Sequence, residues 1–393
     1  MKDFKYYTPT EVIFGKESEG HLVEMIKKYG GKKVLLHYGG KSAERSGLLA
    51  SIRTMLNEGG VDFVELGGVK PNPRLQMVRD GIALCKKEGV DFLLAVGGGS
   101  VIDSCKAIGM GMRYDGDVWD IYARKYAPKE SLPVGVVLTI PAAGSEMSDA
   151  SVITNEDGDL KIGFGSSICR PKFAIMNPVR TFTLPPYQTA CGATDIMMHT
   201  MERYFGSVDD MTLIDNIAEA LLRTVKDSVF HVLRNPEDYR NRACIMWASS
   251  LGHNDLTGDR SYSDFATHQI EHELSAVFDV AHGAGLAAVW GSWARYVYKE
   301  NVSRFVRFAV NVMDVPNDFT DPEATALAGI EAVERFYRAI GMPTSIHELI
   351  GREITEDEIK LLALKCSHND GRKIGSFKVL DRHDMEQIYR MAK

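Results

Sequence analysis

The apolar pattern of this 393-residue chain changes once, at the Thr-Leu-Pro-Pro segment that spans residues 183–186. Before this segment, short apolar runs alternate with longer mixed stretches. We expect strands at 33–37, 61–66, 91–96 and 134–140, helices at 43–57, 74–88 and 101–111, and an added hairpin over 151–164. Strands that alternate with helices predict a parallel sheet with both faces covered, a Rossmann-like α/β arrangement.

After the Thr-Leu-Pro-Pro segment, the sequence predicts helices only. Thr183 can cap a helix, and prolines fit the first turn of one. Apolar residues then recur every three or four positions, for example at Ile214, Ile217 and Leu221. The expected helices are 187–206, 211–234, 238–256, 263–277, 283–298, 302–314, 322–340 and 355–369. The chain is therefore expected to form two domains, an α/β domain at 1–184 and an all-α domain at 185–393.

Composition excludes several classes of function. The net charge is −7, from 46 Lys and Arg against 53 Asp and Glu, and the chain has no basic tail, which argues against nucleic acid as a partner. No apolar run reaches the roughly 18 residues of a membrane span, and the charged first 20 residues do not fit a secretory segment. The six cysteines are widely spread without a CxxC pair, which predicts reduced thiols and a cytoplasmic location.

The strongest candidate for cofactor binding is a glycine cluster after the third expected strand. It consists of Gly97, Gly98, Gly99 and Ser100, with Asp103 in the helix that follows. At such a strand-to-helix junction, backbone N–H groups and the helix dipole bind phosphate, and a Cβ would keep a pyrophosphate away from the backbone. We interpret the cluster as a phosphate site; the alternative is a tight turn.

A weaker cluster follows the first expected strand. It contains Gly39, Gly40, Lys41 and Ser42, and no acidic residue appears before Glu44. Many NAD sites hold the adenine ribose with an acid, so its absence beside a basic residue predicts a preference for NADP(H) over NAD(H). The alternative is a solvated turn with ordinary surface charges.

Two further segments lie where expected strands end. Asn72 lies between two prolines in a rigid turn. The loop that runs from Thr139 through Ser148 is polar and rich in small residues, which suits the nicotinamide side of a cofactor. Either segment, taken alone, could equally be an ordinary loop.

In the helical half, acidic and imidazole side chains occur with metal-ligand spacing. Asp195 and His199 are four residues apart, so a helix places them on one face, and His268 and His282 follow in a stretch rich in small residues. A carboxylate with imidazoles and no thiolate suits Fe(II) or Zn(II). A single histidine of this kind is usually structural; the combination predicts a metal site.

His272 lies one turn after His268. It could be a further metal ligand, a proton relay or a cofactor contact, because a neutral imidazole is suited to carrying a proton near pH 7. Its neighbours Glu271 and Glu273 could instead mark an exposed face. We expect His253, His347, His368 and His383 to be structural.

Together these segments resemble the iron-containing alcohol dehydrogenase family, in particular its butanol dehydrogenase-like branch. The resemblance rests on the glycine cluster with Asp103 and Lys106, the loop that begins at Thr139, Gly-Ala-Thr-Asp at 192–195 with His199, and the stretch 268–285. It implies the fold shared with dehydroquinate synthase, with metal and nicotinamide in a cleft between a Rossmann-like domain and an all-helical one. It also implies a homodimer.

The resemblance further implies individual roles. The implied metal ligands are Asp195, His199, His268 and His282, and the implied cofactor contacts are Gly39, Gly98 to Ser100, Thr139 and Lys161. Family members that carry aspartate near position 39 resemble NAD users. Glycine at this position therefore supports a preference for NADP(H). Phe265, Asp255 and Gly291-Ser292 depart from the branch's usual residues on the expected substrate side.

The expected activity is reversible hydride transfer between NADP(H), or NAD(H), and a primary alcohol or aldehyde, with one divalent metal and with Asp195, His268 and His272 acting in catalysis. One alternative is a lyase of the dehydroquinate synthase type on the same fold, but residues 244–300 contain no dense Arg/Lys cluster for an acidic, phosphate-bearing substrate. Another is a non-catalytic nucleotide or metal sensor.

Overall fold

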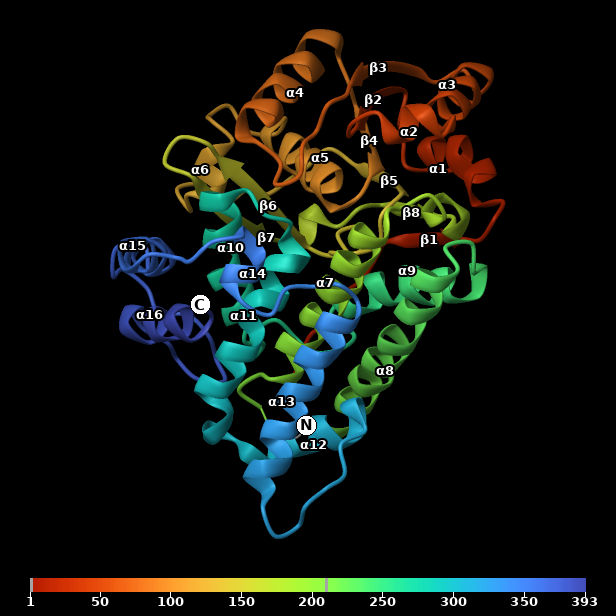
Figure 1. Ribbon diagram of the computed structural model, residues 1–393. Helices are drawn as coiled ribbons and strands as arrows, with labels where there is room; N and C mark the ends of the chain where they lie inside the picture. The colour runs from red at the N-terminus through yellow and green to blue at the C-terminus, as the bar shows by residue number, and fades with distance from the viewer. Residues whose placement is uncertain (1–2, 209–210) are drawn as a thin grey trace. The chain divides into compact units, whose positions relative to one another are not determined.

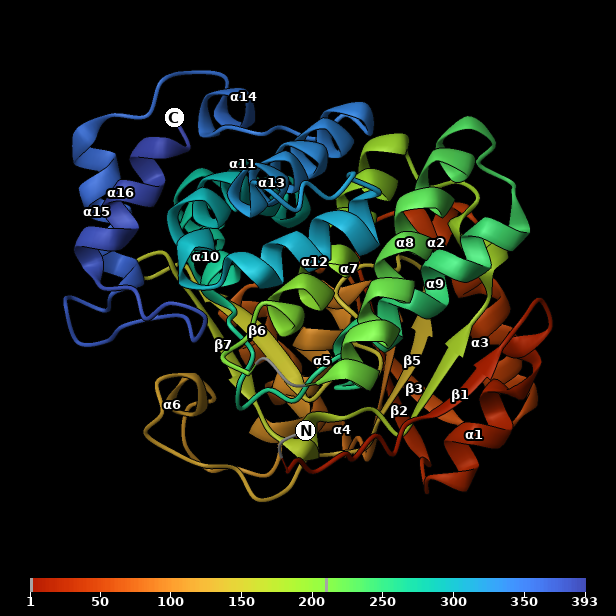
Figure 2. The same cartoon turned by 90° about the horizontal axis from the view of Figure 1, so that it is seen from below.

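The computed structural model describes residues 3–208 and 211–393. The chain forms two compact units, shown in Figures 1 and 2. One unit is Tyr7–Thr183, and the other combines the start of the chain up to Tyr6 with Leu184–Lys393. The division therefore falls at the Thr-Leu-Pro-Pro segment, where the apolar pattern changes.

The first unit is built on a six-stranded parallel sheet with the order β1-β8-β5-β4-β2-β3. Its strands are β1 (Glu11–Phe14), β2 (Lys33–Tyr38), β3 (Asp62–Leu66), β4 (Phe92–Gly97), β5 (Val134–Leu138) and β8 (Phe173–Met176). The four predicted strands are present, and β4 is buried along its whole length, as a central parallel strand requires. The sequence analysis did not predict β1 and β8, which have only four residues each.

Helices cover both faces of this sheet. They are α1 (Leu22–Lys28), α2 (Ser42–Arg45), α3 (Leu48–Glu58), α4 (Leu75–Glu88), α5 (Gly99–Gly111) and α6 (Trp119–Tyr122). Alternate strand residues such as Leu36 and Leu94 form a core with α1 and α3. The helix predicted at 43–57 is two helices, because Gly47 adopts a left-handed conformation with φ 75° between them.

The predicted hairpin is also present, as the antiparallel pair β6 (Ala150–Asn155) and β7 (Leu160–Gly165). Its turn uses left-handed backbone at Gly158 and Asp159, with φ values of 86° and 50°. Strand β6 packs against α5, so the hairpin is anchored beside the helix that opens at the glycine cluster.

His37 is a buried polar side chain that ties three elements of this unit together. It lies on β2, its Nδ1 is 2.7 Å from the carbonyl oxygen of Leu66 on β3, and its Nε2 is 2.9 Å from Ser104 Oγ on α5. Because the carbonyl can only accept, Nδ1 carries the proton and Nε2 accepts from the serine hydroxyl. Burial lowers the pKa of His37 from 6.5 to about 4.

This burial makes the stability of the fold sensitive to acid. Between pH 6.5 and 4 the unfolded chain binds a proton at His37 that the folded chain does not, so stability falls as pH falls, by about 3 kcal/mol over this range. We expect His37→Gln, whose amide can donate to Leu66 and accept from Ser104, to lose correspondingly less stability across the same range. Urea unfolding of both proteins from pH 7 to pH 4 measures the difference; parallel stability profiles would contradict it.

The second unit is helical. Its helices are α7 (Pro186–Tyr204), α8 (Thr212–Arg234), α9 (Tyr239–His253), α10 (Ala266–Phe278), α11 (His282–Val297), α12 (Val302–Met313), α13 (Pro322–Ala339), α14 (Ile346–Ile350), α15 (Glu356–Cys366) and α16 (Arg382–Met391). Short 3-10 helices occur across the two units at Ser18–His21, Ser167–Cys169, Pro178–Thr181 and Tyr298–Glu300. The eight predicted helices are present, whereas α14 and α16 were not predicted.

Two helices form the centre of this unit. Most residues of α7 and nearly all of α11 are buried, so both are surrounded by other helices rather than lying at the surface. They contact each other, and α8 packs beside both α7 and α9, as Figure 2 shows for the pair α8 and α9. Large rings, including those of Trp290, Trp293 and Phe205, fill the core around them.

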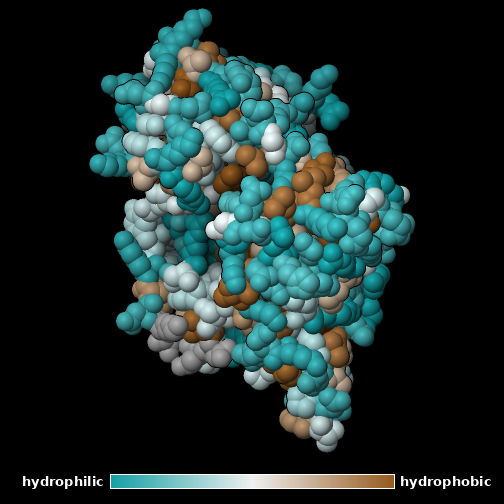
Figure 3. Space-filling model, turned by 90° about the vertical axis from the view of Figure 1, so that its left-hand side faces the viewer, coloured by the Kyte–Doolittle hydropathy of each residue, from teal (hydrophilic) through white to brown (hydrophobic). Residues whose placement is uncertain are grey.

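The face drawn in Figure 3 is mostly hydrophilic, with hydrophobic residues in separate small areas. The large hydrophobic side chains with the greatest exposure are far apart in sequence: Phe319, Leu213 and Val379. In the part of the chain that the structure describes, no helix is both long enough and apolar enough to span a membrane.

Candidate metal centre and cofactor site

Helix α7 carries Asp195 and His199 one turn apart on the same face. Both side chains are buried, with 4% and 5% exposure. Buried helix positions are ordinarily apolar, so a carboxylate and an imidazole held together in this core need a compensating partner.

Helix α10 places His268 in its first turn. The chain enters this helix through Phe265, whose φ of 53° is rare for an aromatic residue, so α10 begins three residues later than predicted. Two carboxylates satisfy its first N–H groups: Oδ2 of Asp264, just before the helix, accepts from Ala266 N at 3.1 Å, and Oε1 of Glu202 on α7 accepts from His268 N at 3.1 Å. These contacts fix the start of α10, and with it His268.

Helix α11 begins at His282, and the glycine after it explains how this residue reaches α7. A Cβ on Gly283 would lie 2.2 Å from the carbonyl oxygen of Cys191, one turn before Asp195. Only glycine lets the start of α11 approach the α7 backbone this closely. Gly283 therefore serves a contact between two helices.

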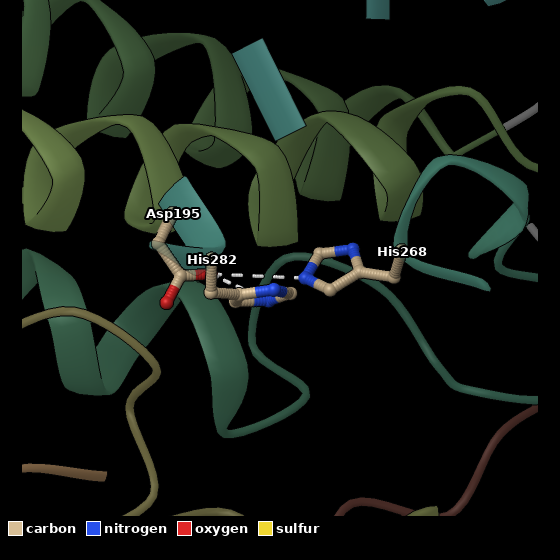
Figure 4. A group of neighbouring side chains, drawn as sticks. All are labelled: Asp195, His268 and His282. Carbon is tan, nitrogen blue, oxygen red and sulfur yellow. Dashed lines mark ion pairs between the residues drawn. The ribbon is translucent and has the colours of Figure 1, made fainter. Parts of the chain in front are cut away.

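The four predicted metal ligands converge. Asp195 Oδ1 lies 3.2 Å from His199 Nε2, 3.7 Å from His268 Nε2 and 3.8 Å from His282 Nε2. Figure 4 draws Asp195, His268 and His282, which offer ligand atoms within 4.8 Å of one another. Ligands about 2.1 Å from a tetrahedral ion would be about 3.4 Å apart, close to these distances.

Two of these atoms need a partner. Asp195 Oδ1 and His268 Nε2 are buried, and neither forms a hydrogen bond with any residue that the structure describes. Buried polar atoms are normally satisfied, and a cation bound between these two atoms would satisfy both. The residues fit a divalent cation in their number, chemistry and spacing.

The charges around the site are unevenly distributed. Burial and the nearby His253 hold the pKa of His199 well below its usual range. Burial also opposes protonation of His268, but the carboxylates of Glu202 and Asp195 outweigh it and raise the pKa of His268 to about 9. Glu202 and Asp195 therefore favour positive charge at His268, whereas burial and His253 disfavour it at His199.

His272 lies beside this group. Its ring is perpendicular to that of His268, with the centroids 6.4 Å apart, and 5.7 Å from that of His282. The side chain is half-buried, and its neighbours Glu271 and Glu273 are only 0% and 6% exposed, so this turn of α10 is not a solvated acidic face. With Glu271 and His282, His272 forms a second set of ligand atoms within 4.8 Å of one another.

The structure adds three residues that the sequence analysis did not select. Glu202 hydrogen-bonds His268 Nδ1, and Glu271 hydrogen-bonds His282 Nδ1. The ring of His253, which we expected to be structural, stacks on that of His199 with the centroids 3.8 Å apart. The sequence contains a signal for both glutamates, because each lies about one helical turn after a predicted ligand: Glu202 after His199 and Glu271 after His268.

In the Tyr7–Thr183 unit, the predicted cofactor segments lie at the carboxyl ends of the parallel strands. Gly97 ends β4 in register with Leu138 of β5, and Tyr38 of β2 pairs with Val96. The segments that follow these strands therefore gather at the carboxyl ends, where parallel sheets bind ligands. They contain the predicted contacts Gly39, Gly40, Ser42, Gly97, Gly98, Gly99, Ser100 and Thr139.

The glycine cluster has the geometry of a phosphate-binding turn. Gly98 is the N-cap of α5, and Gly99 and Ser100 form its first turn, so the helix starts two residues earlier than predicted. A Cβ on Gly98 would lie 3.1 Å from Ile140 Cβ, and one on Gly99 would lie 3.1 Å from Ala143 Cβ. The glycines thus also allow close packing of the loop after β5.

Asn72, Asp103, Ser148 and Lys161 complete the predicted cofactor contacts. Asn72 has a left-handed φ of 54°, and Lys161 is buried on β7. Asp103 accepts hydrogen bonds from Ser145 Oγ at 2.5 Å and from Val152 N at 2.9 Å. Asp103 thus holds neighbouring protein segments; whether it or the other three residues touch a cofactor stays a prediction.

Lys106 extends this network. Its side chain is fully buried, and its Nζ donates to Ser145 Oγ at 2.9 Å, to the Ser148 carbonyl oxygen at 3.0 Å and to the Ala150 carbonyl oxygen at 2.7 Å. Lys106 therefore fastens the loop after β5, and the start of the hairpin, to α5.

A carboxylate–imidazole cluster in a helical unit, together with a glycine-rich turn at the carboxyl ends of a parallel sheet, is the combination expected of an enzyme that uses a metal ion and a nucleotide. Comparison with known families agrees. Residues 9–178 match the model described as iron-containing alcohol dehydrogenase, and residues 189–393 match the C-terminal model of the Fe-containing alcohol dehydrogenase family. The chain belongs to the iron-containing alcohol dehydrogenase family, which confirms the resemblance and the expected fold class.

Individual relatives match along the whole chain. The probable NADH-dependent butanol dehydrogenase 1 of Bacillus subtilis is 42% identical over 392 residues, covering 100% of both chains. The NADPH-dependent aldehyde reductase YqhD of Escherichia coli is 34% identical, covering 88% of this chain and 89% of the relative. The crystal structure of NADH-dependent butanol dehydrogenase A from Thermotoga maritima has a TM-score of 0.95 at 37% identity and covers 100% and 99% of the two chains.

Proposed function

We propose that this protein catalyses reversible hydride transfer between a nicotinamide cofactor and a primary alcohol or aldehyde. The observation that carries the proposal is the convergence of three imidazole Nε2 atoms on one unsatisfied oxygen of Asp195. The relatives named above, butanol dehydrogenases and an aldehyde reductase, support the substrate class. A homodimer and a cytoplasmic location are part of the same proposal.

In this proposal, Asp195, His199, His268 and His282 hold one divalent ion, Fe(II) or Zn(II). Such an ion supplies Lewis acidity, which polarises an aldehyde carbonyl or lowers the pKa of an alcohol. Asp195 contributes the negative charge among the ligands, and the imidazoles bind as neutral groups through Nε2. Asp195, His199 and His268 are buried, which keeps water away from them and strengthens the electrostatic interactions between them.

Other residues would bind the cofactor and move the proton. The backbone N–H groups of Gly99 and Ser100, at the start of α5, would bind the pyrophosphate with the help of the helix dipole. The nicotinamide supplies or accepts the hydride. His272, half-buried beside His268 and His282, would exchange a proton with solvent at a ring nitrogen.

We also propose that NADP(H) is preferred over NAD(H). After β2, Lys41 and Arg45 are exposed, and the first acid, Glu44, is paired with Arg53 at 2.9 Å. An acid already engaged by arginine is poorly placed to hold a ribose 2′-hydroxyl, whereas the cations suit a 2′-phosphate. The relatives include both NADH- and NADPH-dependent enzymes, so this choice depends on the residues of this chain.

One experiment tests both the proposed activity and the proposed cofactor preference. The purified protein, loaded with Fe(II) or Zn(II), is assayed with a series of straight-chain aldehydes from acetaldehyde to hexanal and with each cofactor. We expect consumption of reduced cofactor, with kcat/KM at least about tenfold higher for NADPH, the ratio that about 1.4 kcal/mol of differential binding gives. Higher efficiency with NADH would overturn the cofactor preference. Binding of NADPH without consumption would indicate a sensor, and chemistry without net cofactor turnover would indicate the lyase.

A further inference from the structure

Two buried glutamates occupy equivalent positions behind two of the predicted metal ligands. Glu202 and Glu271 are 1% and 0% exposed. A carboxylate is almost never buried this completely unless hydrogen bonds or a cation compensate for its lost hydration. Neither glutamate belongs to the predicted ligand set, so each requires an explanation of its own.

Each glutamate holds one imidazole from the side that faces away from Asp195. Glu202 Oε2 accepts a hydrogen bond from His268 Nδ1, and Glu271 Oε2 accepts one from His282 Nδ1. The Nε2 atoms of the same two rings are those that point to Asp195 Oδ1. Since a carboxylate accepts, Nδ1 carries the proton, and Nε2 presents its lone pair to the site.

The second oxygen of each carboxylate is also fixed. Glu202 Oε1 accepts from the backbone N–H of His268 at 3.1 Å, and Glu271 Oε1 accepts from Ser275 Oγ. A carboxylate held at both oxygens cannot rotate, so it fixes the plane of the ring that it contacts. His199 differs, because its Nδ1 is buried and has no hydrogen-bond partner among the described residues.

Gly285 on α11 provides the space that the carboxylate of Glu271 occupies. A Cβ on Gly285 would lie 2.7 Å from Glu271 Oε1 and 2.8 Å from its Cγ. Glycine at this position of α11 is therefore required for the carboxylate to lie between α10 and α11.

We propose that Glu202 and Glu271 are positioning residues, whose carboxylates fix the tautomer and ring orientation of His268 and His282 so that both present Nε2 to a divalent ion. The inference rests on the proposed function, because it requires those histidines to be ligands. Outer carboxylates of this kind raise the basicity of a ligand imidazole, and losing one typically costs roughly 10- to 100-fold in metal affinity.

The test measures Zn²⁺ affinity, without any assay of turnover. Metal-free protein competes with a chromophoric chelator for Zn²⁺, for the wild type and for Glu202→Ala and Glu271→Ala. We expect each variant to bind roughly 10- to 100-fold more weakly. Glu202→Gln and Glu271→Gln should recover part of this loss, because the amide oxygen can still accept the Nδ1 proton.

A matched control comes from the same helical unit. Glu219 on α8 is also buried, at 3% exposure, but its carboxylate accepts from Arg307 Nε at 2.6 Å and from Tyr204 at 2.9 Å. Glu219→Gln removes a buried anion without touching a predicted ligand, so its Zn²⁺ affinity should stay within about twofold of the wild type. This control separates positioning of the ligands from loss of a buried charge.

Two further variants keep the inference falsifiable if the alanine proteins fail to fold. Gly285→Ala should displace the carboxylate of Glu271 and weaken Zn²⁺ binding while Glu271 itself is retained. Asp195→Ala tests the ligand set: if it binds Zn²⁺ as the wild type does, the proposed metal site fails, and this inference fails with it. If Asp195→Ala loses Zn²⁺ but the variants at Glu202, Glu271 and Gly285 bind normally, only the positioning role is overturned.

Discussion

Asp195→Ala is expected to lower the rate of NADPH-linked aldehyde reduction by at least about 1000-fold, and added Fe²⁺ or Zn²⁺ should not restore it. Asp195 Oδ1 is the atom from which the three imidazole nitrogens lie 3.2, 3.7 and 3.8 Å away. Removing the carboxylate takes away the shared ligand and the negative charge that offsets the metal. Alanine also leaves the three imidazoles without the carboxylate that their Nε2 atoms face.

The measurement combines metal analysis of protein purified without chelator, NADPH binding and aldehyde turnover. NADPH binding should survive, because the glycine cluster belongs to the Tyr7–Thr183 unit and Asp195 does not. Asp238→Ala is the matched control: Asp238 caps α9 by accepting from Asn241 N at 3.1 Å, and its loss should leave metal content and turnover unchanged. Full activity in Asp195→Ala protein would end the proposal of a metal-dependent dehydrogenase.

The fold was predictable wherever apolar residues form long or periodic runs. Strand β4 is buried throughout, and its run of consecutive apolar residues predicted it without ambiguity. Strands β1 and β8 have four residues each, too few for a pattern to stand out from the surrounding loops. Helix α16 begins with a capping box at Asp381 and Asp384 and buries Met385, Ile388 and Tyr389 at helical spacing, so the sequence contained a signal that the analysis missed.

The candidate site was predictable to the extent that its chemistry is local. The four-residue spacing of Asp195 and His199 places both on one face of α7, and that rule needs no tertiary information. The hydrogen bond from His268 to Glu202 joins residues 66 positions apart, and no spacing rule identifies such a pair. Similarly, the role of Gly283 becomes clear only when α11 meets the backbone of α7.

Lys106→Met is expected to lower the free energy of unfolding by about 3–5 kcal/mol, because it leaves the carbonyl oxygens of Ser148 and Ala150 without this donor and removes the positive charge near Asp103. Lys106 is fully buried, and Asp103 precedes it by three residues on α5. Burial lowers the pKa of Lys106 and raises that of Asp103, and each group's charge opposes the effect of burial on the other. Methionine fills a similar volume, so the loss would come from unpaired polar groups rather than from a cavity.

The same variant should bind NADPH more weakly, because Lys106 fastens the loop after β5 through Ser145 and Ser148. Urea unfolding and NADPH titration measure the two effects. Lys28→Met is the matched control in the same unit: Lys28 pairs with Glu11 at 2.6 Å on the surface, so its removal should leave the unfolding midpoint nearly unchanged.

In the double variant Asp103→Asn/Lys106→Met, the loss of stability should be smaller than the sum of the single losses, because neither charge then remains without the other. Additive losses, or a Lys106→Met protein as stable as the Lys28→Met control, would show that the loop is held by its packing and not by this buried pair.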